Sequence, residues 1–109
     1  MPEYHKLVRD GIPELIAAGG HSCITRTLEH EEYIDQLRAK LREEAEEYFR
    51  EDNDRLALEE LADLLEVIRA LAATHGGSPE TLEQIRVEKA ERRGGFQERI
   101  FLLRVEDGS

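Results

Sequence analysis

The sequence predicts a mainly α-helical protein, an antiparallel helical bundle with one short two-stranded β ribbon, formed by a single domain over residues 1–109. Two stretches, 29–51 and 54–75, carry apolar residues at helical spacing and contain no Gly or Pro. The turn between them, 52–54, is made of residues that cap helices. A length of 109 residues fits one domain with a modest core. Together these observations predict two long helices packed against each other.

The N-terminal quarter predicts a short helix followed by a strand. Pro13 suits the first turn of a helix that continues to about Ala18, and Gly19–Gly20 ends it. Residues 22–28 are rich in Thr and Ile, which favour a strand. We expect the single cysteine, Cys23, to be a small buried apolar side chain within that strand.

The C-terminal third predicts a fourth helix and a second strand. Ser78, Pro79 and Glu80 are a cap, a first-turn proline and a first-turn acid, and the helix they begin continues to about Arg93. Residues 100–105 predict a closing strand that pairs with the first one. Because two strands alone are marginally stable, the ribbon requires packing or a partner subunit.

Composition excludes several classes of function. The net charge of −10 argues against nucleic-acid binding through a basic surface. With 39% hydrophobic and 37% charged residues, the sequence predicts a soluble protein, and it contains no apolar run long enough to span a bilayer. A single cysteine argues against a disulfide framework and fits a reducing cytoplasm. We therefore expect a cytoplasmic protein without membrane or nucleic-acid partners.

Four carboxylates occupy unusual positions on the two long helices. On a helical wheel, at ~100° per residue, Glu44 falls in the middle of the apolar stripe of its helix and Glu47 at its edge. Glu60 and Asp63 repeat this arrangement on the next helix, whereas Glu43 lies further round. If the helices pack antiparallel, these carboxylates converge at a half-buried interface, which is unfavourable without compensation.

A divalent cation would compensate the four acids. Carboxylate ligands without His or Cys favour a hard ion, so we expect Mg²⁺, with Mn²⁺ as an alternative. The other interpretation is that acid-rich helices carry paired carboxylates by chance, as part of a solvated face.

Cations are placed where they can hold phosphate. On the fourth helix, Lys89 and Arg93 continue the line of the apolar residues, and Lys6 and Arg9 lie in the N-terminal segment. These four residues are candidate phosphate ligands; the alternative is that they are surface charges, with Lys89 and Arg93 covering apolar surface by their stems. Acids that hold Mg²⁺ beside cations that hold negative charge suit a nucleotide bound through its phosphates.

The acids also carry a resemblance. The pattern Glu43-Glu44-x-x-Glu47 followed by Glu60-x-x-Asp63 resembles the signature of the all-α nucleotide pyrophosphohydrolases, the superfamily of the MazG-like proteins. Their acids are spaced to lie on single helix faces, as here.

Three flanking motifs, at 6–13, 61–68 and 89–96, are similar to a small single-domain branch of that superfamily. Its members are phosphoribosyl-ATP-pyrophosphohydrolase-like house-cleaning proteins. The resemblance covers about residues 4–105, and it departs at Gly11, where the branch usually has Lys.

The resemblance implies a fold of the all-α NTP pyrophosphatase type and Mg²⁺-dependent cleavage of a nucleoside triphosphate between the α and β phosphates. It implies the following metal ligands: Glu44, Glu47, Glu60 and Asp63. Glu43 would orient the attacking water or support the ligands, and Glu44 is a candidate catalytic residue as well as a metal ligand. The four cations would hold the outer phosphates. It also implies a homodimer or a dimer of dimers, which the wide apolar arc of the 54–75 helix favours independently.

Three alternatives remain open from the sequence. The chain can be a phosphoribosyl-ATP pyrophosphohydrolase of histidine biosynthesis, although the tract 64–67 resembles the house-cleaning branch more closely. It can be a non-enzymatic helical module with a structural metal site. The third alternative, an antitoxin-like or regulatory interaction protein, is disfavoured by the lack of a disordered tail.

Overall fold

The computed structural model describes residues 4–108, and the helices predicted from the sequence are present in it. Their bounds are α1 (Ile12–Ala18), α2 (His30–Arg50), α3 (Asp54–Thr74) and α4 (Pro79–Arg93). Each end lies within one residue of its expected position. The prediction of a mainly helical protein is therefore confirmed.

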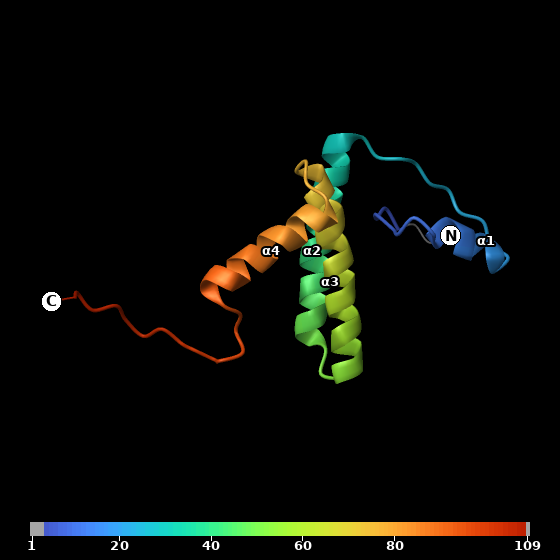
Figure 1. The fold of residues 1–109 in the computed structure, drawn as a ribbon. Coiled ribbons are helices and arrows are strands. Elements are labelled where there is room, and N and C mark those ends of the chain that lie inside the picture. Colours follow the sequence, from blue (N-terminus) through green and yellow to red (C-terminus); the bar gives the residue numbers. More distant parts are fainter. Residues whose placement is uncertain (1–3, 109) are drawn as a thin grey trace.

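The two long helices, α2 and α3, form an antiparallel pair joined by a tight turn (Figure 1). Asn53 caps the N-terminus of α3, because its Oδ1 accepts a hydrogen bond from the backbone N–H of Leu56 at 3.0 Å. Leu37 from α2 and Val67 from α3 are the buried apolar residues of the described chain, 4% and 9% exposed. The core of the single chain is thus confined to the interface of these two helices.

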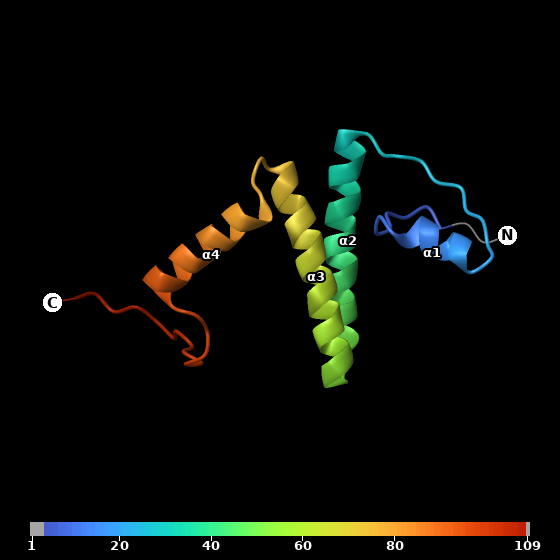
Figure 2. The same cartoon turned by 45° about the vertical axis from the view of Figure 1, so that its right-hand side comes forward.

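Helix α4 leaves this pair at an angle and points away from it (Figure 2). Ser78 caps its N-terminus, accepting a hydrogen bond from the backbone N–H of Thr81 on its Oγ at 3.1 Å. Gly76, just before it, has a φ of 77°, a left-handed conformation that favours glycine. The chain therefore changes direction sharply between α3 and α4.

The predicted β ribbon is wrong for the described residues 4–108, none of which lies in a strand. Segments 22–28 and 100–105 lie on opposite sides of the α2–α3 pair and extend away from it (Figures 1 and 2). Alternating and β-branched residues indicate an extended backbone, but a ladder also needs a neighbouring strand, which neither segment has. For the same reason Cys23 is exposed, and its predicted burial is wrong as well.

The single chain is open. Its radius of gyration is 19.1 Å, whereas a compact domain of this length has about 13 Å. Its accessible surface is 10213 Å², whereas a folded monomer of this mass exposes about 6,200 Å². Within residues 4–108, no helix combines the length and the apolar character needed to cross a membrane.

Candidate metal centre

Five carboxylates from α2 and α3 meet at the interface of the two helices. Candidate ligand atoms of Glu44, Glu60 and Asp63 all lie within 4.8 Å of one another, and so do those of Glu43, Glu44 and Glu47. Glu44 belongs to both groups and joins them into one set, which we call the carboxylate cluster. The antiparallel pairing of the helices brings together acids that are more than a dozen residues apart in the sequence.

Glu44 lies at the centre of the carboxylate cluster and is buried, with 8% of its surface exposed. Two buried carboxylate oxygens, Glu44 Oε2 and Glu60 Oε2, have no hydrogen-bond partner. An unsatisfied buried acceptor costs free energy, and a charged one costs more. A bound cation or a proton on these two oxygen atoms would therefore stabilise the cluster.

The burial and crowding of these carboxyls raise their pKa values. Burial raises the pKa of Glu44 from 4.5 to about 7, and the neighbouring carboxyls of Glu60, Glu47 and Asp63 add to the increase. Burial also raises the pKa of Glu60, with Glu47 and Asp63 contributing. Close carboxylates without a compensating charge resist ionising together. A bound divalent cation would reverse this preference.

One predicted cation reaches the cluster. Arg9, from the N-terminal segment, donates a hydrogen bond from Nη2 to Asp63 Oδ1 at 2.6 Å. Both side chains are partly exposed, at 58% and 41%, so solvent screens this ion pair. Arg9 thus offsets negative charge at the exposed side of the cluster, at Asp63.

A second cation at the cluster, Lys40, escaped the sequence analysis. Its Nζ lies 3.7 Å from Glu43 Oε2 and 3.9 Å from Glu44 Oε1, and its side chain is 22% exposed. The sequence contained a signal for this contact: Lys40 precedes Glu43 by three residues and Glu44 by four, and residues at these spacings lie side by side on a helix. In an acid-rich helix that spacing is common, which is why it did not single out Lys40.

The structure does not bring the other predicted cations to the carboxylate cluster. Lys6 Nζ lies 5.3 Å from the ring centroid of Tyr4. Lys89 and Arg93 line a hollow at the C-terminal end of α4, together with Arg86 and residues 94–97. Among residues 4–108, neither Lys89 nor Arg93 has a carboxylate within 4.0 Å. Their role as phosphate ligands stays a prediction.

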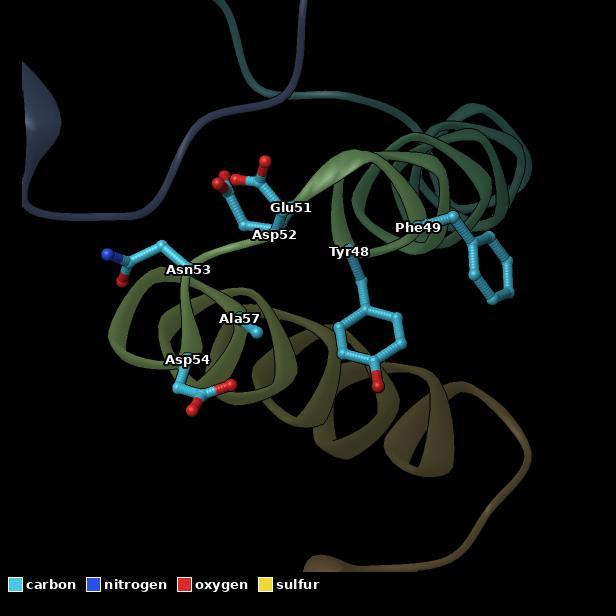
Figure 3. A pocket seen from close by; sticks show the side chains of 7 residues that line it. All are labelled: Tyr48, Phe49, Glu51, Asp52, Asn53, Asp54 and Ala57. Carbon is cyan, nitrogen blue, oxygen red and sulfur yellow. The ribbon is translucent and has the colours of Figure 1, made fainter.

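A second hollow lies at the turn between α2 and α3 (Figure 3). Tyr48 points across it towards α3, whereas Phe49 points outward. Its lining is Tyr48, Phe49, Glu51, Asp52, Asn53, Asp54 and Ala57. It contains no cation and none of the predicted site residues, so it is separate from the carboxylate cluster.

The residues of the cluster fit a hard divalent cation. All candidate ligands are carboxylate oxygens, which suit Mg²⁺ or Mn²⁺ rather than a soft metal. The unpartnered oxygens of Glu44 and Glu60 are available as ligands without breaking an existing hydrogen bond. Asp63 accepts the hydrogen bond from Arg9 on Oδ1, which leaves its second carboxylate oxygen for an ion.

Comparisons with known proteins assign no activity to the chain. A scan against known protein families finds no match, and no solved structure matches. A protein of Mycolicibacterium smegmatis described as uncharacterized is 50% identical over 54 residues, which is 50% of this chain. The chain spans about half of that relative's length, 55%. Its function therefore has to be inferred from the carboxylate cluster.

Proposed function

We propose that this protein is a Mg²⁺-dependent nucleotide pyrophosphohydrolase, which cleaves a nucleoside triphosphate between its α and β phosphates to give a monophosphate and pyrophosphate. The observation that carries the proposal is the carboxylate cluster with two buried oxygens that have no hydrogen-bond partner, Glu44 Oε2 and Glu60 Oε2. The resemblance of the acid pattern to the all-α nucleotide pyrophosphohydrolases supports the choice of reaction.

The metal ligands in this proposal are Glu44, Glu47, Glu60 and Asp63. When bound, Mg²⁺ supplies charge neutralisation and Lewis acidity at phosphorus and lowers the pKa of a coordinated water. The pKa of Glu44, raised by burial to about 7, makes its ionisation and ion binding mutually dependent. The rigid backbone of two packed helices holds the ligands in place before substrate arrives.

Glu43 is the proposed base. Its side chain is 51% exposed, so it can reach solvent while it remains next to Glu44 and Glu47. It would orient the attacking water and accept its proton. Lys40, whose Nζ lies 3.7 Å from Glu43 Oε2, would help to orient that carboxylate by ion pairing.

Arg9 has two proposed partners. In the free protein it pairs with Asp63; in the loaded site it would turn to a substrate phosphate while Asp63 binds the ion. Such an exchange costs little because the ion pair is exposed to solvent. Lys6, in the same segment, and Lys89 and Arg93, on α4, are further proposed phosphate ligands that would stabilise the leaving pyrophosphate.

The test is the release of pyrophosphate from a panel of nucleoside triphosphates and phosphoribosyl-ATP, with Mg²⁺, with Mn²⁺ and with EDTA. The decisive variant is Glu60→Gln, which removes a ligand charge at nearly constant volume. Its matched control is Glu59→Gln, the exposed neighbouring acid outside the cluster. We expect metal-dependent turnover, a loss of at least about 100-fold in Glu60→Gln and wild-type rates in Glu59→Gln.

The other outcomes separate the alternatives. Turnover of phosphoribosyl-ATP alone would assign the protein to histidine biosynthesis. A thermal midpoint raised by Mg²⁺ with every compound intact would show a structural metal site and overturn the enzymatic proposal. Equal activity in Glu60→Gln and Glu59→Gln would remove the cluster from the reaction.

A further inference from the structure

The carboxylate cluster consists of two overlapping groups of three acids. One group spans both helices and consists of Glu44, Glu60 and Asp63. The other lies on α2 alone and consists of Glu43, Glu44 and Glu47. Acids in such numbers are also found in sites that bind two metal ions, in which neighbouring ions share ligands. Whether this cluster takes one ion or two therefore depends on what already lies beside each group.

The group on α2 already has a cation of the protein beside it. Lys40 Nζ lies 3.7 Å from Glu43 Oε2 and 3.9 Å from Glu44 Oε1. The side chains of Lys40 and Glu44 are only 22% and 11% exposed. Water therefore screens this contact less than it screens the ion pair of Arg50 and Glu46 on the same helix, whose side chains are 71% and 68% exposed.

The group that spans both helices lacks such a cation at its centre. The buried oxygens Glu44 Oε2 and Glu60 Oε2 have no hydrogen-bond partner, and Glu44 as a whole is only 8% exposed. Arg9 reaches this group from outside, at Asp63 Oδ1. Glu44 thus has one oxygen beside Lys40 and a second that is available as a ligand.

Charge makes the Lys40 ammonium and a second divalent cation alternatives. Both would lie against the same carboxylates, Glu43 and Glu44, and like charges so close together in a partly buried position repel each other. We infer that the Lys40 ammonium takes the place of a second metal ion, so that the carboxylate cluster binds one divalent cation. The ion and its ligands are those of the proposed function, on which this inference rests.

Lys40 in this role separates the duties of the acids on α2. Glu43, held by Lys40, is not a metal ligand and keeps its carboxylate for the attacking water. Within residues 4–108 Lys40 forms no ion pair with Glu47, so Glu47 remains available to the single ion. Lys40 is therefore a positioning residue, which acts through Glu43 and through the number of ions bound.

The test counts the divalent cations bound to the metal-free full chain, by titration with Mn²⁺ followed by electron paramagnetic resonance. We expect one Mn²⁺ per chain in the wild type and two in Lys40→Met, which replaces the ammonium by an uncharged side chain of similar length. The two ions of the variant should show magnetic coupling, which separates a shared site from scattered surface binding. Lys40→Arg, which keeps the charge, should bind one.

The matched control is Arg50→Met, which breaks the other ion pair described above, with Glu46, and should bind one Mn²⁺. Glu43→Gln keeps the number of ions testable if Lys40→Met fails to fold. Because Glu43 is not a ligand of the single ion, Glu43→Gln should also bind one Mn²⁺. A Glu43→Gln variant that binds none would make Glu43 a ligand and overturn the inference.

The remaining outcomes separate this inference from the proposed function. Two coupled ions in the wild type would overturn the inference and leave the proposed function standing. One ion in a folded Lys40→Met variant would reduce the contacts of Lys40 to an ordinary ion pair of a helix surface and also overturn it. A wild type that binds neither Mn²⁺ nor Mg²⁺, the latter measured by calorimetry, would overturn the proposed function and the inference together.

Discussion

The α2–α3 pair and the segments on either side of it use the same kinds of residue with opposite results. In the pair, Leu37 and Val67 are almost fully buried. In the flanking segments, Ile24 and Phe101 are 101% and 86% exposed. The difference is one of sequence distance: a short turn brings α2 and α3 together, whereas the flanks have no partner close in the sequence. Apolar residues favour burial in both regions, and in this chain the surface that is buried is the one whose partner lies nearby in the sequence.

The residues of the proposed site are likewise divided between the packed helix pair and the flanking segments. All the acids of the carboxylate cluster lie on the packed pair, whereas the four cations predicted to bind phosphate lie in the flanks. Of these four, Arg9 alone contacts the cluster within the described residues. The metal-binding half of the site is therefore built by the helix pair, and the phosphate-binding half depends on how the flanks are placed.

The largest expected effect comes from breaking the packed pair. Leu37→Ala should lower the free energy of unfolding by about 2–5 kcal/mol, since it leaves a cavity in the core. Leu15→Ala in α1, where the leucine is exposed, should change it by about 0.5 kcal/mol or less. Urea denaturation measures both. Equal losses would mean that the flanks are as well packed as the pair.

The pH dependence of stability also distinguishes the pair from the flanks, because the carboxyls with raised pKa values, Glu44 and Glu60, lie in the pair. Glu44 has a pKa raised from 4.5 to about 7, so between these values the folded protein binds more protons than the unfolded chain. The free energy of unfolding of the metal-free protein should therefore fall as pH rises through this window, by at most about 1.4 kcal/mol per pH unit for one group.

Urea titrations across that pH range, with EDTA and with saturating Mg²⁺, measure this effect. The ion should abolish the fall, since it favours the ionised carboxylates. Stability that rises with pH in EDTA would contradict the raised pKa of Glu44.

Removing the central charge isolates its own contribution. In EDTA at about pH 8, Glu44→Gln should raise the free energy of unfolding by on the order of 1 kcal/mol, because it removes a buried carboxylate charge that stands among other acids and whose Oε2 has no hydrogen-bond partner. The same variant should lose the increase in thermal midpoint that Mg²⁺ produces in the wild type. Glu46→Gln, an acid at 68% exposure on the same helix, is the control and should match the wild type in both respects.

The smallest effect on stability is expected where a flank meets the pair. Arg9→Ala should change the free energy of unfolding by less than about 1 kcal/mol, because the ion pair with Asp63 is exposed. Its effect should appear instead as a raised KM for the nucleotide. Arg26→Ala, which breaks another exposed ion pair, with Glu32, is the control. An unchanged KM in Arg9→Ala would remove Arg9 from substrate binding.

Much of the fold could be predicted from the sequence because the relevant signals are local. Asn53 and Ser78 cap the helices that follow them, and the apolar period of α2 and α3 identifies the faces that meet. The same period singled out Glu44 and Glu60 as acids on apolar faces, where the structure places them. These signals act within a few turns of helix and need no knowledge of the rest of the chain.

The errors concern contacts between distant segments. Extended backbone was expected at 22–28 and 100–105, but strand pairing depends on which segments become neighbours, and these two lie on opposite sides of the helix pair. The wheel likewise identified the face of α4 that carries Lys89 and Arg93, but not the direction of the helix. That direction depends on the turn at Gly76, where a single backbone conformation reorients everything that follows.

The sequence by itself therefore determined the helices, their caps and the acids that each helix presents on its apolar face, because hydrogen bonds and side-chain period act locally. The tertiary structure decided that Glu44 and Glu60 each bury a carboxylate oxygen without a hydrogen-bond partner, that Arg9 forms an ion pair with Asp63, and that Leu58 and Leu65 of α3 stay exposed. Each of these depends on the approach of residues far apart in the chain, where packing and loop closure rather than local propensity set the result.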